Sequence, residues 1–379
     1  MQKQYDAIII GGGIIGASIA CEMAKRGLKV VVVEKERIAC RASSAAGGML
    51  GAQVEMGKEV GPLFNLAIRS RALFASLVEE LRESSGIDAN LITKGMLRIA
   101  FTEEEKREFQ EVIAYHHRAG QKAEWLEGRE VRSRESGLTG EIAGAMYIPD
   151  DGQLLAPELS QAFAKTAANR GAEIREFTEV TSLIIENGKV SGVQTDNGCI
   201  TADEVIIASG AWSEKLLKQT GIELGTYPVK GECFSVKTTT PLLTSTVFSH
   251  GCYLVPKRGS RLLVGATVKE RTFDQKVTVE GIRLLMQRAM RILPGIVDAE
   301  WEKAWAGLRP QTRDGLPYLG RHPKFTNLIV ASGHFRNGIL LSAITGVIVA
   351  DLVEGRRTDG IDLAPFALDR HAEVKAGVR

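Results

Sequence analysis

The chain has 379 residues, of which 44% are hydrophobic and 25% are charged, and its formal net charge is +2 at pH 7. This is an ordinary globular composition, long enough for two domains or for one domain with a large insertion. The balanced charge provides no electrostatic basis for binding nucleic acid or an anionic membrane surface, so we expect neither partner. Glycines and charges interrupt every long apolar run. We therefore expect no membrane-spanning segment and a cytoplasmic location.

Cysteine and histidine positions give no metal-binding pattern. The five cysteines lack the close spacing of metal ligands, and they are Cys21, Cys40, Cys199, Cys233 and Cys252. Their odd number and wide spacing favour reduced thiols, most of them in the core. His116 and His117 lie on a charged helical stretch, where a solvated face is more plausible than a metal site. We expect no bound metal.

The first 35 residues carry a nucleotide-binding pattern, in which an apolar run at 7–10 leads into Gly11-Gly12-Gly13-Ile14-Ile15-Gly16. Gly11 permits a tight turn, Gly13 leaves no Cβ between the backbone and a pyrophosphate, and Gly16 lets the next helix pack on the strand. A second apolar run at 30–33 ends on Glu34, whose carboxylate can accept hydrogen bonds from ribose hydroxyls and would repel a 2′-phosphate. Because strand, helix, second strand and acid are in register, the pattern predicts a dinucleotide site rather than a flexible glycine turn.

The rest of the chain alternates between this nucleotide-binding region and a second one. A tract of small residues at 41–51 permits close approach to a flat ligand, and a buried strand at 204–213 ends in small residues that include Gly210. The other expected elements are helices at 17–26, 62–84, 103–119, 153–171, 279–293 and 338–352, and strands at 95–100, 173–177, 189–195, 198–202, 233–236, 252–256, 261–267 and 328–331. We expect the segment from the helix at 103–119 to residue 148 to be a loop.

Two arginine motifs near the carboxyl end suggest recognition of a carboxylate. Arg309 lies in the run 305–310 between a glycine and a proline, and Arg336 lies in the run 332–338 where the last strand turns into the last helix. Arginine holds a carboxylate through two parallel hydrogen bonds, and an amino-acid substrate always presents one. A single arginine is more often a surface charge. The glycine and proline around Arg309 favour a binding role for that residue.

Taken together, the motifs resemble those of the D-amino-acid oxidase superfamily of FAD-dependent amine oxidoreductases, and most closely its thiamine-pathway glycine oxidases. The resemblance covers essentially the whole chain and is carried by residues 11–16 with Glu34, 43–51, 205–212, 228–232, 307–310 and 333–338. The first motif occurs in many flavoproteins, whereas the others together are specific.

The resemblance implies an α/β fold with a discontinuous Rossmann-like FAD-binding domain and a substrate-binding α+β domain with a mainly antiparallel sheet. We expect FAD binding at 1–86, 151–224 and 307–379, and substrate binding at 87–150 and 225–306. Arg309 is expected to bind the substrate carboxylate, Tyr253 to hydrogen-bond it, and Arg336 to line the site near the flavin. These three are the expected catalytic residues, and Gly51 joins them in binding substrate.

By the same resemblance, the cofactor is noncovalent FAD, since no cysteine context indicates covalent attachment. The residues expected to bind FAD are Gly11, Gly13, Ile14, Ile15, Gly16, Glu34, Lys35, Ala42, Ser43, Gly47, Gly48, Met49, Val180, Gly210, His334, Phe335, Arg336, Asn337, Gly338, Ile339 and Leu340.

The implied reaction is oxidation of glycine, sarcosine or small D-amino acids by hydride transfer to the flavin and then to O2. The products would be glyoxylate or another 2-oxo acid, ammonia and hydrogen peroxide. The resemblance further implies that the product feeds synthesis of the thiamine thiazole ring and that the enzyme is a homotetramer. A D-amino-acid dehydrogenase that passes electrons to a quinone or carrier is the alternative enzyme. A nonenzymatic flavin-binding protein is a third possibility, which the two arginines and Tyr253 disfavour. The glycine oxidase pattern usually has a histidine near Gly251 and a methionine at Val268. Both positions are expected to line or approach the pocket, so a glycine and a valine there would enlarge or reshape it, which puts the substrate range in question more than the reaction type.

Overall fold

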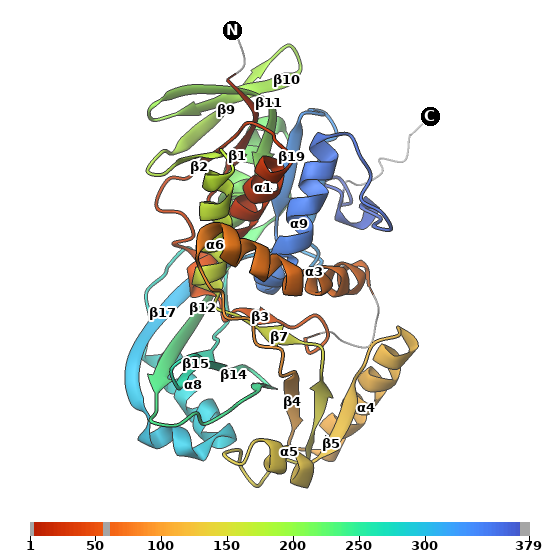
Figure 1. The fold of residues 1–379 in the computed structure, drawn as a ribbon, viewed down its shortest axis with the longest axis vertical. Coiled ribbons are helices and arrows are strands. Elements are labelled where there is room, and N and C mark those ends of the chain that lie inside the picture. Colours follow the sequence, from red (N-terminus) through yellow and green to blue (C-terminus); the bar gives the residue numbers. More distant parts are fainter. Residues whose placement is uncertain (1–3, 56–60, 372–379) are drawn as a thin grey trace.

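The computed structural model describes residues 4–55 and 61–371, and Figure 1 shows two layered regions connected by long strands. The chain begins with the expected βαβ unit, formed by β1 (Tyr5–Ile10), α1 (Ile14–Lys25) and β2 (Val30–Val33). All of β2 is buried, which explains its unbroken apolar run, because a parallel strand covered on both faces has no solvent side. Gly27 follows α1 with φ +81°, the left-handed conformation that ends many helices.

The first sheet is built around β1, which runs parallel to β2 on one side and to β11 (Gly198–Ile207) on the other. Beyond these lie β8 (Glu173–Arg175) and β19 (Leu328–Ser332), both parallel, and β18 (Tyr318–Arg321), which is antiparallel to β19. This sheet order places the carboxyl ends of β1, β11 and β19 together at one edge, where ligands of such sheets bind.

The prediction of two separate strands at 198–202 and 204–213 is wrong, because β11 is one continuous strand. Its first half pairs antiparallel with β10 (Lys189–Thr195), and its second half pairs parallel with β1 and β19. The charged residues Asp203 and Glu204 mark the change of partner and not a break in the backbone. The strand β9 (Val180–Glu186), which the sequence analysis did not predict, pairs with the other edge of β10.

Helices α1, α3 (Pro62–Ser85), α6 (Ala156–Asn169) and α9 (Gly338–Val353) pack together on this sheet (Figure 1). The segment Phe335–Val353 is long and apolar enough to cross a membrane by length and composition alone, although Gly346 and Asp351 interrupt its apolar run as expected. Within the protein, however, 61% of it is buried, and α9 packs against both α1 and α3. A core helix enclosed in this way is apolar on all sides.

The second sheet is mainly antiparallel, as predicted, with one parallel pair between β4 and β13. Its strands are β4 (Met96–Ala100), β5 (Glu124–Glu127), β6 (Gly144–Ile148), β12 (Tyr227–Lys237), β13 (Thr246–Ser249), β14 (Cys252–Lys257), β15 (Arg261–Gly265), β16 (Lys269–Glu270) and β17 (Glu300–Gln311). Helices α4 (Glu103–Arg118), α5 (Gly128–Arg134) and α8 (Val279–Ile292) accompany it. Together the two sheets confirm the predicted fold class.

Two features of the second sheet differ from the sequence prediction. The expected loop after α4 contains β5, α5 and β6, whose apolar residues Leu126, Val131 and Ala145 enter the core beneath the sheet. These elements are short, so their periodicity gives little signal. The strand β17 was not predicted, since only the arginine motif at 305–310 was noted in this part of the chain. The predicted domain boundary between residues 306 and 307 falls inside this strand. Short elements complete the chain, namely α2 (Ala42–Ala45), β3 (Met49–Leu50), β7 (Gly152–Gln153) and α7 (Ser213–Leu217).

On α4, His116 is fully buried, contrary to the expected solvated face. Its Nδ1 lies 3.4 Å from Nε2 of Gln53, and its Nε2 has no hydrogen-bond partner in the part of the chain that the structure describes. Burial lowers the pKa of this imidazole to about 4. The ring is therefore neutral at pH 7.

We predict that His116 makes the native state sensitive to mild acid. In the unfolded chain the His116 ring binds a proton near pH 6.5, whereas in the native state it does so only near pH 4. The free energy of unfolding therefore falls as the pH decreases between these two values. In His116→Gln the loss of unfolding free energy from pH 7 to pH 5 should be smaller than in the wild type by about 2 kcal/mol. Urea unfolding at both pH values measures this, with His117→Gln on the exposed side as control. The same pH dependence in His116→Gln and wild type would contradict the argument.

Candidate functional site

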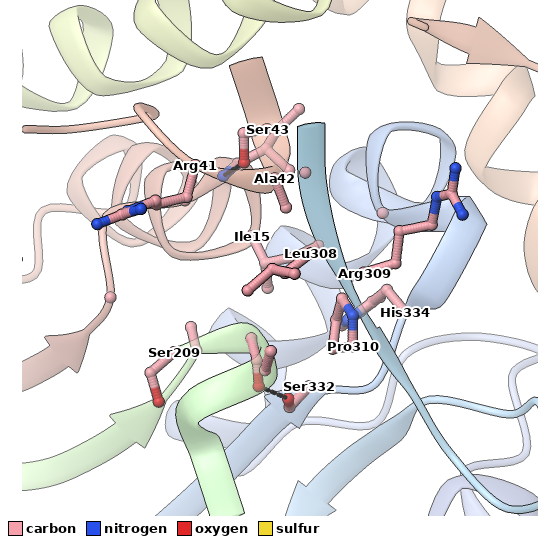
Figure 2. A pocket seen from close by; sticks show the side chains of 18 of the residues that line it. Ile15, Arg41, Ala42, Ser43, Ser209, Leu308, Arg309, Pro310, Ser332 and His334 are labelled. Carbon is pink, nitrogen blue, oxygen red and sulfur yellow. Dashed lines mark hydrogen bonds between the residues drawn. The ribbon is translucent and has the colours of Figure 1, made fainter. Parts of the chain in front are cut away.

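A cavity of about 410 Å³ lies at the carboxyl edge of the first sheet. It extends from the β1–α1 turn across the ends of β11 and β19 to β17 of the second sheet. Figure 2 shows Leu308, Arg309 and Pro310 on β17, with Arg41, Ala42 and Ser43 on the facing segment. The cavity thus combines the nucleotide-binding pattern and the arginine motif, which are almost 300 residues apart in sequence.

The β1–α1 turn is possible only because its glycines lack side chains. Gly11 has φ +108°, and a Cβ there would lie 2.7 Å from the carbonyl oxygen of Ala208. At Gly16 a Cβ would lie 1.9 Å from the carbonyl oxygen of Gly11, so the first turn of α1 approaches the strand end closely. Gly13 faces the cavity beside the Ser43 hydroxyl. The three positions have the steric environment that a dinucleotide turn requires.

Two polar side chains hold this turn. The Glu34 carboxylate accepts one hydrogen bond from the Gly12 amide, at 2.7 Å, and another from the Glu36 amide, at 2.9 Å. The Ser43 hydroxyl accepts from the amide of Ile14, at 2.8 Å. The first amides of a helix have no intrahelical acceptor and attract anions. Ile14 and Ile15, in the first turn of α1, line the cavity, which therefore fits a pyrophosphate at that point.

Strand β17 is fastened to the segment that carries Ser43. The indole of Trp305 donates a hydrogen bond of 3.0 Å to the carbonyl of Ala45. Gly307 faces the same residue, and a Cβ there would lie 2.6 Å from the Ala45 side chain. The close approach of the two regions along the cavity depends on this glycine.

Arg309 projects from β17 across β12. A Cβ at Gly231 would lie 2.1 Å from Nη2 of Arg309, so the guanidinium occupies the space that a side chain would fill. Its Nη1 is 3.4 Å from the carbonyl oxygen of Thr267. Among the ion pairs between described residues, none includes Arg309. A half-buried guanidinium without a carboxylate partner can receive one from a ligand.

Tyr253 on β14 lines the cavity near Arg309 and is almost completely buried. Its ring lies over Gly265, where a Cβ would come within 2.5 Å of the hydroxyl, and its hydroxyl is 3.6 Å from Sγ of Cys233. Burial raises the pKa of Tyr253 well above 10 and also raises the pKa of the Cys233 thiol. Both groups are therefore neutral at pH 7, and the phenol is a hydrogen-bond donor.

Arg336 follows β19 and, unlike Arg309, is paired. Its Nε lies 2.7 Å from Oε2 of Glu55, and both side chains line the cavity. His334, two residues earlier, is buried with its Nε2 3.2 Å from the Thr345 hydroxyl. Burial lowers the pKa of His334 to about 4, so this ring adds no charge at pH 7.

The structure brings most of the predicted site residues to this one cavity. Of the residues predicted to bind FAD, all line it except Gly16, Gly48, Asn337 and Leu340; of those predicted to bind substrate, Tyr253, Arg309 and Arg336 line it and Gly51 does not. Gly16 and Gly48 instead allow close backbone packing, since a Cβ at Gly48 would lie 2.0 Å from the carbonyl oxygen of Leu154.

The two positions that depart from the glycine oxidase pattern do not line the cavity. Gly251 lies on the exposed turn between β13 and β14, where its carbonyl accepts a hydrogen bond of 2.8 Å from Arg288. Val268 is 60% exposed. The expectation that they reshape the pocket directly is therefore not supported by their positions.

Several residues at or next to the site were not predicted from the sequence, and three of them make contacts that shape it. Glu55 follows no recognisable motif, and Gly231 was part of a family motif without an assigned role. Lys257 on β14 donates a hydrogen bond of 2.7 Å to the carbonyl of Leu154, and the same carbonyl lies against Gly48. Burial lowers the pKa of this lysine to about 7. Lys257 thereby links the second sheet to the segment that carries Gly47 and Met49.

Comparison with known proteins gives consistent matches. The family described as "FAD dependent oxidoreductase" (DAO) matches residues 6–352. A glycine oxidase of Geobacillus kaustophilus is 49% identical over 374 residues, covering 98% of both chains. The crystal structure of glycine oxidase from Geobacillus kaustophilus superposes with a TM-score of 0.94 and covers 97% of this chain and 99% of that one. The "Bifunctional protein ThiO/ThiG" of Synechocystis is 35% identical over 93% of this chain, which spans 52% of that longer protein.

The family match over residues 6–352 and the relative at 49% identity agree with three features of the cavity, namely the glycine turn, the Glu34 carboxylate and Arg309. The chain therefore belongs to the DAO family and is an FAD-dependent amine oxidoreductase.

Proposed function

We propose that this enzyme is a glycine oxidase that also accepts sarcosine and small D-amino acids. Glycine, O2 and water would give glyoxylate, ammonia and hydrogen peroxide. The observation that carries the proposal is Arg309, a guanidinium without a carboxylate partner among the described residues, placed beside Tyr253 in a cavity with a dinucleotide turn. The similarity to glycine oxidases over nearly the whole chain supports the choice of substrate.

FAD would be held without a covalent bond, with its pyrophosphate at the first turn of α1 and its ribose hydroxyls at Glu34. The residues fit this group, because the turn has no side chain facing the cavity and the Glu34 carboxylate is already oriented by two backbone amides. A carboxylate oxygen has two lone pairs, so each can still accept a hydroxyl. Bound FAD supplies the acceptor for a hydride, chemistry that the protein side chains do not provide.

The protein's contribution to the reaction is to bind and orient the substrate. Arg309 would hold the substrate carboxylate by paired hydrogen bonds, and the neutral phenol of Tyr253 would donate another. This fixes the α-carbon, whose hydrogen leaves as hydride once the amine is neutral, and water hydrolyses the resulting imine. Positioning of this kind accounts for much of the rate of such reactions.

Three further assignments are proposals that rest on the family resemblance. We infer that residues 1–86, 151–224 and 307–379 bind FAD while 87–150 and 225–306 bind substrate, with β17 passing from one part to the other. We infer a homotetramer. We also infer that the product feeds synthesis of the thiamine thiazole ring, in keeping with the similarity to a bifunctional ThiO/ThiG protein.

Anaerobic mixing of the purified flavoprotein with glycine, sarcosine or D-alanine tests the proposed function. Glycine should bleach the flavin spectrum, and admission of air should restore it with formation of one hydrogen peroxide per flavin. Bleaching followed by slow recovery in air would indicate a dehydrogenase that uses another electron acceptor. A flavin that none of these amines reduces would contradict the proposal.

Glu34→Gln should weaken FAD binding by about tenfold or more, because a hydrogen bond to a charged group contributes about 1.5–3 kcal/mol. The side-chain amide of the glutamine would also place its NH2 group against the backbone N–H of Gly12 or Glu36, and both of these donors need an acceptor. Fluorescence titration of the apoprotein with FAD measures the dissociation constant. The exposed Glu79→Gln on α3 serves as control. An unchanged FAD affinity in Glu34→Gln would exclude the assigned role.

Arg309→Ala should raise KM for glycine while FAD remains bound. Loss of a buried partner of a carboxylate costs about 2–5 kcal/mol, which corresponds to a rise of about 30-fold or more. Peroxide-coupled kinetics measures KM, and the flavin spectrum gives the FAD content. Arg313→Ala is a matched control, because Arg313 is exposed four residues further along and does not line the cavity. Wild-type kinetics in Arg309→Ala would refute the role of this arginine.

A further inference from the structure

Two arginines line the end of the cavity that also contains Tyr253, and they differ in one respect. Arg309 has no ion-pair partner among the described residues, whereas Arg336 is 2.7 Å from Glu55. The Glu55 side chain is 18% exposed and lines the cavity itself. A carboxylate from the protein therefore already occupies the second arginine.

The position of Glu55 is set by a buried network. Glu55 lies in a turn in which the amides of Gln53 and Val54 both donate to the carboxylate of Asp151, at 3.1 and 2.9 Å. Asp151 is fully buried and forms a 2.5 Å ion pair with Arg71. A turn held by a buried ion pair and two backbone hydrogen bonds keeps the Glu55 carboxylate facing Arg336 before any ligand arrives.

The charges around this pair decide which ligands fit. Among the residues that the structure describes, Arg98 on β4 is a further cation near Glu55, and its guanidinium is turned to the Phe109 ring and lies 3.9 Å from Glu108. A ligand with one carboxylate meets the unpaired Arg309. A second anionic group would meet Arg336 together with the Glu55 carboxylate, and like charges at contact distance repel.

We propose that Glu55 determines specificity by occupying Arg336, so that the cavity accepts amines with one carboxylate and rejects those with two. Removing the negative charge of Glu55 would leave Arg336 free as a second anion site. The enzyme would then bind dicarboxylates such as malonate and iminodiacetate. This inference rests on the proposed function, since it requires that Arg309 bind the first carboxylate.

The test compares acetate with malonate as ligands of the FAD-loaded enzyme, using the perturbation of the flavin spectrum to measure each dissociation constant. The wild type should bind acetate more tightly than malonate. In Glu55→Gln the malonate-to-acetate ratio of affinities should rise by about tenfold or more, as expected for a new hydrogen-bonded contact with a charged group. The double variant Glu55→Gln with Arg336→Gln should lose that gain, because the second cation is gone.

Glu204→Gln is the matched control, because Glu204 is 17% exposed, pairs with Arg321 at 2.8 Å and does not line this cavity. It should keep the wild-type ratio. Equal wild-type affinity for acetate and malonate would overturn the inference without any variant, as would an unchanged ratio in Glu55→Gln. If the wild type binds neither acetate nor glycine, the proposed function itself fails, which is a separate outcome.

Discussion

Two glycines that face each other on β12 and β17 determine how the two regions of the protein meet. Gly231 pairs with Gly307 in the strand register. The missing side chain of Gly231 lets the Arg309 guanidinium lie across β12, and that of Gly307 lets β17 approach Ala45. Since β17 carries the arginine and the segment with Ala45 borders the nucleotide turn, both ends of the cavity depend on this pair.

The nucleotide end of the cavity is already organised by hydrogen bonds within the protein. Glu34 and Ser43 accept from backbone amides of the segments that they join, and Trp305 ties β17 to the same place. Lys257 makes a corresponding contact from the second sheet to Leu154. A site held in this way loses little conformational freedom on binding, so more of the contact energy is available as affinity.

Sequence patterns predicted the parts of this structure that depend on local signals. The βαβ unit and the amphipathic helix α3 follow from periodicity and glycine positions within a few turns of chain. The continuity of β11 and the length of β17 were missed, because each is defined by pairing with strands far away in sequence. Glu55 was missed for the same reason, since its partner Arg336 is 281 residues away and no local pattern marks it.

In the proposed reaction, burial and pairing make Arg309 the dominant charge at the substrate end. Tyr253 and His334 are neutral because burial makes the charged form of either side chain unfavourable. The charge of Arg336 is balanced by Glu55. By pairing with the substrate carboxylate, Arg309 would also neutralise the negative charge that otherwise stabilises the ammonium form of the amine. Hydride loss requires the neutral amine. The same guanidinium would therefore orient the substrate and favour its reactive protonation state, while the Glu55–Arg336 pair keeps a free carboxylate from stabilising the ammonium.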